Sequence, residues 1–190
     1  MKLIIGLGNP GSEYTATRHN VGFWVADALQ EVFGLPGFAK KCKGLVAKGR
    51  MVGMDVVVLK PQTFMNLSGE SVQAAMAFYK VAAADMLVIH DELDLVVGRL
   101  KHKIGGSDAG HNGLKSITAA LGTGEYPRLR IGIGRPEHKS QVSDYVLEPF
   151  GAADALLMRE RVAWVAENMP KLVEDPHVAL AKLEAVAKKA

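Results

Sequence analysis

Apolar positions along the chain predict strands and helices in alternation. An apolar run predicts a first strand over residues 1–5, and helical spacing up to Val32 predicts a helix that begins near Thr17 or Arg18. Other apolar runs predict strands over 45–51, 55–60, 86–89, 95–103 and 129–134. Helical spacing predicts further helices over 68–79 (capped by Asn66 or Ser68), 114–121, 152–168 and 175–188. Because no linker, repeat or low-complexity segment interrupts this order, we predict one α/β domain over residues 1–190, built on a mixed sheet.

The composition adds limits to this fold class. Apolar residues make up 48% of the 190 residues, which is typical of a folded globular protein. The 23 basic and 20 acidic side chains give a net charge of +3, so a nucleic-acid partner has to be argued from local clusters of charge. Cys42 is the only cysteine, which excludes an internal disulfide and favours a reducing compartment. No apolar run is long enough to span a bilayer, and the run after Lys2 is too short for a signal peptide, so we expect a cytoplasmic protein.

The segment GLGNPGSEYTATRHNVG, residues 6–22, joins the first predicted strand to the first predicted helix. Ligand sites in open α/β sheets form at the carboxyl ends of strands, so its polar side chains are expected to gather there: Asn9, Tyr14, Arg18, His19 and Asn20. Its first six letters match the dinucleotide fingerprint G-x-G-x-x-G, but Pro10 and the irregular residues after it delay the helix. No strand ending in an acidic residue follows about twenty residues later. We therefore discount a nucleotide cofactor and an oxidoreductase.

Amides, one imidazole and one carboxylate are the chemical groups that the predicted strand ends bring together. The strand ends deliver Asn9, Asn66 and Asp91, and neighbouring loops add His19 and Asn112. No G-x-S-x-G, H-E-x-x-H or cysteine pair is present, so neither a serine hydrolase nor a zinc enzyme is indicated. Magnesium held by the acidic group of Asp91, Glu92 and Asp94 is left open as an alternative.

This set of groups suits hydrolysis by water. A neutral imidazole has a reference pKa of about 6.5 and can take a proton from water, while a neighbouring carboxylate fixes its tautomer and stabilises the imidazolium. Amide side chains can hold the substrate carbonyl and the developing oxyanion. We predict that His19 pairs with Asp91. His90 directly precedes Asp91 on a strand, points to the other face and is interpreted as structural.

Two kinds of surface segment complete the prediction. Arg99, Lys101 and Lys103 alternate along the predicted strand 95–103 and share one face, which is either an exposed edge or a track for phosphates, with Lys139 as a further candidate. The basic run Lys40–Lys43 is interpreted as a solvated loop. The glycine-rich segment 105–113 is predicted to be a mobile loop, and this segment and residues 140–150 are candidate gates over a groove.

Five motifs, in order and without a large gap, resemble the bacterial peptidyl-tRNA hydrolase family over almost the whole chain up to about Phe150. They are Gly6–Gly11 with Tyr14 and Thr17–Asn20, Thr63–Gly69, His90–Asp94, Gly110–Leu114 and Arg128–Gly134. The resemblance implies hydrolysis of the ester between a peptide's terminal carboxyl group and the terminal ribose of tRNA, which rescues stalled peptidyl-tRNA and returns tRNA to translation. It also implies a monomer without metal or cofactor, with a twisted mixed sheet flanked by helices on both faces, related to the phosphorylase/hydrolase-like architecture.

The resemblance further assigns roles to individual residues. By the family pattern His19 is the catalytic base, Asp91 stabilises its protonated form, and Asn9 distinguishes N-blocked from free aminoacyl-tRNA. The same pattern assigns contacts with the tRNA end or the peptide to Tyr14, Phe64, Asn66 and Asn112, and the wall of the peptide groove to Met65. The alternative from another class is a non-catalytic RNA-binding protein of the same fold, against which the intact pair His19 and Asp91 argues.

Overall fold

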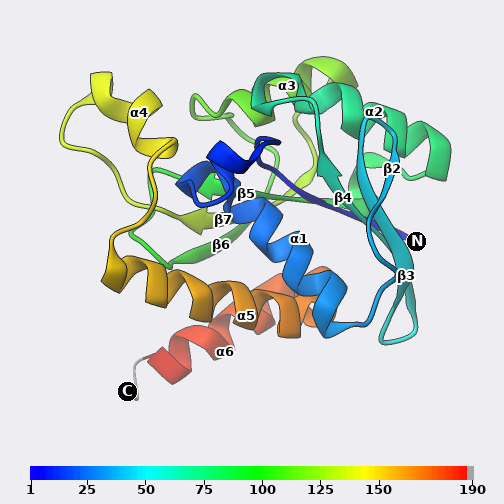
Figure 1. Ribbon diagram of the computed structural model, residues 1–190. Helices are drawn as coiled ribbons and strands as arrows, with labels where there is room; N and C mark the ends of the chain where they lie inside the picture. Colours follow the sequence, from blue (N-terminus) through cyan, green and yellow to red (C-terminus); the bar gives the residue numbers. More distant parts are fainter. Residues whose placement is uncertain (188–190) are drawn as a thin grey trace.

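A seven-stranded mixed sheet lies between two layers of helices in the computed structural model, which describes residues 1–187 (Figure 1). The strands are β1 (Lys2–Gly6), β2 (Ala39–Lys41), β3 (Gly44–Met51), β4 (Met54–Pro61), β5 (Met86–Glu92), β6 (Leu100–Ile104) and β7 (Pro127–Gly132). The helices are α1 (Val21–Val32), α2 (Ser68–Tyr79), α3 (Asn112–Leu121), α4 (Val142–Val146), α5 (Ala152–Glu174) and α6 (Pro176–Ala187). The strand order is β2-β3-β4-β1-β5-β7-β6. The predicted α/β class with a mixed sheet is confirmed.

Parallel pairing fills the centre of this sheet. Strands β4, β1, β5 and β7 are parallel neighbours, while β2, β3 and β6 pair antiparallel with their neighbours at the two edges. Parallel strands are buried on both faces, which accounts for their nearly continuous apolar sequences. The carboxyl ends of the four parallel strands therefore meet at one edge of the fold, where the polar loops of the sequence also lie.

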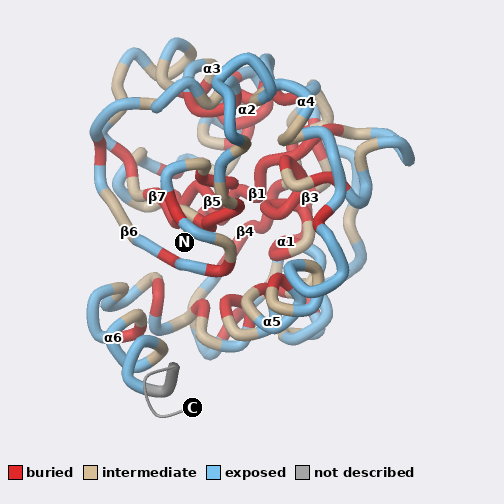
Figure 2. The backbone as a smooth tube through the Cα atoms, turned by 90° about the vertical axis from the view of Figure 1, so that its left-hand side faces the viewer, coloured by how far each residue is buried: buried red, intermediate tan, exposed pale blue. Residues whose placement is uncertain are grey.

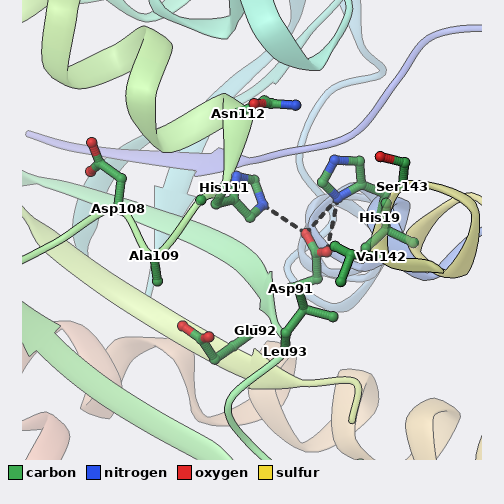
Figure 3. Close-up of a pocket in the computed structure, with 12 residues that line it drawn as sticks. His19, Asp91, Glu92, Leu93, Asp108, Ala109, His111, Asn112, Val142 and Ser143 are labelled. Carbon is green, nitrogen blue, oxygen red and sulfur yellow. Dashed lines mark hydrogen bonds and ion pairs between the residues drawn. The ribbon is translucent and has the colours of Figure 1, made fainter. Parts of the chain in front are cut away.

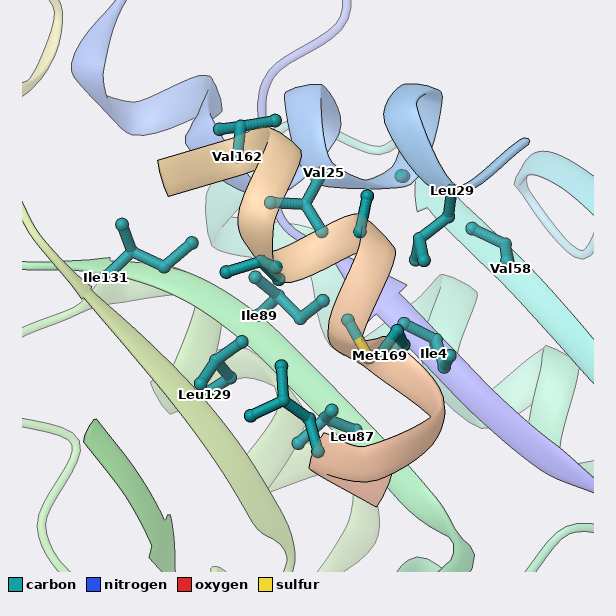
Figure 4. Close-up of a cluster of buried hydrophobic side chains, with 14 of the residues drawn as sticks. Ile4, Val25, Leu29, Val58, Leu87, Ile89, Leu129, Ile131, Val162 and Met169 are labelled. Atoms are coloured by element: carbon teal, nitrogen blue, oxygen red, sulfur yellow. The ribbon is translucent and has the colours of Figure 1, made fainter. Parts of the chain in front are cut away.

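Alternate residues of the strands build two separate cores. Side chains such as Ile4, Val58 and Ile89 pack against α1 and α5 (Figure 4). Their chain neighbours, such as Leu3 and Val57, pack on the opposite face with residues of α2 and α3. Figure 2 shows the buried segments concentrated in the strands and in the helix sides that face them. Each fully buried aliphatic side chain contributes about 1.5–3 kcal/mol, so the two cores together hold the sheet in place.

Close backbone contact joins the end of β1 to the beginning of α1. A Cβ atom on Gly22 would lie 2.4 Å from the backbone nitrogen of Leu7, and one on Gly6 would lie 2.1 Å from the Gly22 carbonyl oxygen. Only glycine fits at these two positions. The contact brings residues 18–20, which precede α1, against the carboxyl end of the sheet. Since α1 begins only at Val21, well beyond Gly11, the helix geometry of a dinucleotide site is not formed.

Two predicted segments differ from the structure near the sheet edges. The strand predicted over 95–103 begins only at Leu100, because Gly98 has a φ of 80° and the Arg99 N–H donates to Val96 O in a turn. The basic run Lys40–Lys43, predicted to be a loop, contributes to the edge strand β2 and to its turn into β3. Pairing with β3 therefore outweighs the low strand preference of lysine.

Several helix ends also differ from the prediction. Neither Asn66 nor Ser68 caps α2 through its side chain, since the N-cap residue is Leu67 and the Ser68 hydroxyl donates to Met65 O at 2.8 Å. Helix α5 runs to Glu174, past the predicted end at residue 168, and includes Pro170. The helix predicted over 175–188 is α6, whose predicted last residue lies outside the described residues.

Candidate active site

Asp91, near the end of β5, and His19, in a 3₁₀ helix before α1, form a buried pair. The His19 Nδ1 lies 2.8 Å from Asp91 Oδ2 and 2.9 Å from Oδ1. Asp91 is only 3% exposed. Figure 3 shows the carboxylate pointing between His19 and a second histidine. The structure therefore places together the two side chains that the sequence paired.

The second histidine is His111, which the sequence analysis did not single out. Its Nε2 donates to Asp91 Oδ1 at 2.8 Å. Its Nδ1 accepts from the backbone N–H of Gly113 at 3.1 Å, because His111 is the N-cap residue of α3. These contacts fix the tautomer with hydrogen on Nε2. His111 lies in the motif Gly110–Leu114, three residues before the predicted helix, but nothing in the sequence indicated its contact with Asp91.

Opposing effects set the charges of this group. Burial penalises the Asp91 carboxylate, but the neighbouring His19 and His111 and their hydrogen bonds hold its pKa well below the usual range. Burial also disfavours the charged form of His19, but the charge and hydrogen bond of Asp91 outweigh it and raise the His19 pKa. With Asp91 ionised and Nδ1 of His19 donating to it, the lone pair of neutral His19 is on Nε2. This is the arrangement that a general base requires.

His90 lies next to this group without joining it. Its ring is buried, its Nδ1 donates to the Asp91 carbonyl oxygen at 2.8 Å, and its centroid is 5.1 Å from that of His111. Burial, together with His111, lowers the pKa of His90 to about 3, so the ring is neutral near neutral pH. This geometry agrees with a structural role.

A pocket of about 260 Å³ opens beside the pair. One wall is the loop before α3, another is α4, and Asp91 and His19 lie between them (Figure 3). The lining residues are His19, Asp91, Glu92, Leu93, Asp108, Ala109, Gly110, His111, Asn112, Val142, Ser143 and Val146. Both segments predicted as gates therefore line the pocket. The loop 105–113, predicted to be mobile, has its first half tied to Arg128, which donates to the carbonyl oxygens of Gly106 and Ser107.

Asn9 belongs to a second group, which does not line this pocket. Its Oδ1 accepts from the Met65 N–H at 2.7 Å, which assigns the amide orientation and leaves Nδ2 as a donor. Asn20 fixes the Asn9 backbone through two hydrogen bonds, from Asn9 N to Asn20 Oδ1 at 2.8 Å and from Asn20 Nδ2 to Asn9 O at 3.0 Å. Asn20, directly after His19 in the chain, therefore links the segment of His19 to Asn9. The sequence placed Asn20 in the loop without indicating this positioning contact.

Tyr14 and Phe64 form an aromatic pair next to Met65. Their ring centroids are 6.3 Å apart and their planes lie at 82°. Phe64 is 51% exposed, and its φ of 57° with ψ of 159° is unusual for a residue with a side chain. The following Met65 is buried, and Asn66 is exposed. The contacts therefore bring Asn9 to Met65 and Tyr14 to Phe64, and Asn66 follows Met65 in the chain.

Comparison with known proteins gives these two groups a context. The sequence model described as peptidyl-tRNA hydrolase matches residues 3–190. The chain belongs to the peptidyl-tRNA hydrolase family. The peptidyl-tRNA hydrolase of Sinorhizobium fredii is 49% identical over 174 residues, which cover 92% of this chain and 72% of that protein. That of Brevibacillus brevis is 48% identical over 167 residues, 88% of each chain. The crystal structure of the peptidyl-tRNA hydrolase from Acinetobacter baumannii is 40% identical, covers 95% of this chain and 93% of its own, and has a TM-score of 0.88.

In this member of the peptidyl-tRNA hydrolase family, the basic residues predicted to form one track are divided. Lys101 and Lys103 lie opposite Arg130 and Arg128 across the β6–β7 pair, so all four side chains share one face. Arg99 precedes the strand, and its guanidinium pairs with Glu184 of α6 at 3.3 Å. The prediction that Arg99 shares a face with the two lysines is wrong, because the turn at Gly98 ends the alternation on which it rested.

The acidic group proposed for magnesium is also divided. Glu92 pairs with Arg130 at 3.0 Å and Asp94 pairs with Arg135, while Asp91 faces the two histidines. This pairing contradicts a magnesium site made by the three acids. Within the described residues, ligand atoms of His19, Asp91 and His111 lie within 4.8 Å of one another, but hydrogen bonds to the carboxylate account for that arrangement.

In residues 1–187 none of the helices combines the length and apolar character needed to cross a bilayer.

Proposed function

We propose that this protein hydrolyses the ester bond of peptidyl-tRNA, with His19 as the general base. The observation that carries the proposal is the Asp91–His19 hydrogen bond, which leaves Nε2 as the basic atom of a ring that lines a pocket. The Nε2 takes a proton from water as the water oxygen attacks the ester carbonyl carbon. The tetrahedral intermediate then expels the ribose oxygen, which receives the proton from His19, and the products are a peptide acid and tRNA.

Amide side chains in the pocket, and in the second group that Asn20 joins to the segment of His19, have the chemistry to bind the other parts of this substrate. The Nδ2 of Asn9 and the side chain of Asn112, at the start of α3, are neutral donors for the ester carbonyl and the oxyanion. The exposed ring of Phe64, next to Tyr14, suits stacking with the terminal bases of tRNA, and Met65 with Asn66 suits contact with the peptide. Because recognition of bases is limited to this end, which is common to all tRNAs, the attached peptide can vary.

The direct test is the release of N-acetyl-amino acid from N-acetyl-aminoacyl-tRNA by the purified protein. Release in single turnover supports the proposal, and tRNA binding without release would favour the non-catalytic RNA-binding alternative.

Translation supplies peptidyl-tRNA, and the single cysteine suits a reducing compartment, so we place the reaction in the cytoplasm. We further propose that the protein acts as a monomer and needs no metal or cofactor.

We expect N-acetyl-aminoacyl-tRNA to be cleaved at least about a hundredfold faster than the free aminoacyl ester. A free ammonium group would be desolvated beside Asn9, whose Oδ1 is already bound to the Met65 N–H and whose Nδ2 is itself a donor. Leaving such a charge unpaired costs several kcal/mol, and about 2.7 kcal/mol corresponds to a hundredfold change in rate. The measurement is kcat/KM for the two substrates at one pH. Equal rates would show that desolvation at Asn9 does not discriminate between them.

The double substitution Lys101→Ala with Lys103→Ala is expected to weaken binding of the tRNA and to flatten its salt dependence. Each phosphate contact that is lost should lower the slope of log K against log salt by about 0.7–0.9. The measurement is a titration of deacylated tRNA at several salt concentrations. Arg99→Ala serves as the control, because Arg99 is turned toward α6, and its slope should equal that of the wild type. An unchanged slope of log K against log salt in the double variant would show that these lysines do not contact the tRNA.

A further inference from the structure

Arg18, the residue before His19, reaches from the catalytic segment to the wall of the pocket. Its Nη1 donates to the carbonyl oxygen of Tyr145 at 2.9 Å and contacts that of Glu148 at 3.4 Å. Its guanidinium carbon lies 3.9 Å from the centroid of the Tyr145 ring and 5.4 Å from that of Phe150. The side chain is 12% exposed. Arg18 is therefore packed into the segment that contains α4.

Helix α4 depends on such contacts for its position. It has five residues, too few for a helix to be stable alone, and it stands at the end of long connections at one side of the fold (Figure 1). Other contacts also hold the segment: the Tyr145 hydroxyl donates to Ile133 O at 2.6 Å, the Arg18 N–H donates to Glu148 O at 3.0 Å, and Thr17 forms a backbone bridge with Pro149. Three residues of this helix line the pocket, namely Val142, Ser143 and Val146.

The anchoring of Arg18 depends on shape more than on charge. The nearest carboxylate, on Glu148, is 3.7 Å away and 61% exposed, which makes it a weak ion pair. Backbone carbonyl oxygens and two aromatic rings make the other contacts. A planar guanidinium satisfies this combination, whereas a lysine ammonium keeps the charge but cannot donate in the same plane while it stacks on a ring.

We propose that Arg18 is a positioning residue that holds α4 against the pocket and thereby sets the affinity for the substrate. This inference rests on the proposed function. The residue acts through Tyr145 and the residues that follow α4, and it takes no part in proton transfer. Loss of the anchor lets α4 move away from the loop before α3, so the substrate binds with fewer contacts while His19 and Asp91 keep their hydrogen bond.

The kinetic test compares Arg18→Met and Arg18→Lys on N-acetyl-aminoacyl-tRNA. Both are expected to raise KM by about tenfold, the effect of losing roughly 1.4 kcal/mol of binding, with kcat within about threefold of the wild type and an unchanged pH profile of kcat. The matched control is Arg161→Met, since the Arg161 Nε donates to Gly98 O at 2.9 Å outside the pocket. Its KM should be that of the wild type. A wild-type KM in both Arg18 variants, a KM restored by lysine, or a kcat loss without a KM change would overturn the proposal.

A second measurement does not depend on activity. Lys139 lies in the 3₁₀ turn directly before α4, and trypsin cleavage after it reports how firmly this segment is held. Cleavage in Arg18→Met should be about tenfold faster than in Arg161→Met, at temperatures well below the unfolding of either variant. Equal rates of cleavage would contradict the anchoring role. If wild-type protein does not cleave the ester, the proposed function fails, while the cleavage by trypsin still decides whether Arg18 anchors α4.

Discussion

Replacement of His19 by alanine is expected to lower kcat for N-acetyl-aminoacyl-tRNA by about a hundredfold or more, with little change in KM. The reason is that the ring carries the only basic atom that the Asp91 contact prepares, while alanine can neither accept the water proton nor return it to the leaving ribose oxygen. A general base contributes typically about 10²–10⁴-fold to a rate. Single-turnover release of the N-acetyl-amino acid measures the chemical step directly.

The control for this experiment is His102→Ala. His102 lies on β6, near His177 of α6 and away from the pocket, so its loss should leave kcat within about twofold of the wild type. Deacylated tRNA should still bind to His19→Ala with the affinity of the wild type, which shows that the surface is intact. If His19→Ala released product at the wild-type rate, the assignment of His19 as the base would have to be abandoned.

Asp91→Asn has the second large expected effect, a loss of about 10²–10⁴-fold in kcat together with a displaced pH profile. In the wild type the rate falls as the pH drops through the His19 pKa, because the imidazolium cannot accept a proton. That pKa lies above 6.5, since Asp91 raises it against the effect of burial. Asparagine removes the negative charge, so the effect of burial, which lowers the His19 pKa, is no longer opposed. The acidic limb of the pH profile, where the rate falls, should therefore move to lower pH.

The position of this limb distinguishes two origins of a loss in rate. A variant that is only misfolded would lose activity by a constant factor at every pH, whereas loss of the carboxylate moves the midpoint itself. The folded fraction of Asp91→Asn is checked by thermal unfolding, because two N–H groups, from His19 and His111, then face one neutral amide. A midpoint that stays at the wild-type pH would show that Asp91 does not control the basicity of His19.

The order of strands and helices could be predicted largely because the central strands are buried on both faces. Their apolar runs, such as 86–89 in β5, identify a strand without knowledge of its partners. The edges were harder, since Lys40 and Lys41 have no sequence signature of a strand, and only pairing with β3 extends them. Arg99 was misplaced for a related reason. The alternation of residues in the sequence continues through Gly98, but the backbone turns there.

The candidate site was predictable where side chains that can transfer protons follow the ends of predicted strands. Histidine and aspartate in polar loops at strand ends indicated the pair His19 and Asp91. The residues that hold the pair or its neighbours in place were not predictable, because their importance comes from partners distant in sequence. His111 meets Asp91 only through the path of the loop before α3, and Asn20 acts through the backbone of Asn9.

The contact of Gly6 with Gly22 has a consequence for how the enzyme works. Because the two backbones touch without room for a methyl group, the segment that carries His19 cannot slide relative to the strand that leads to Asn9. His19 and Asn9 therefore belong to one stiff unit, and we expect the walls around it to be the parts that adapt to peptides of different size. We expect variation among substrates to be accommodated at the periphery, so that the reacting atoms meet in the same geometry each time.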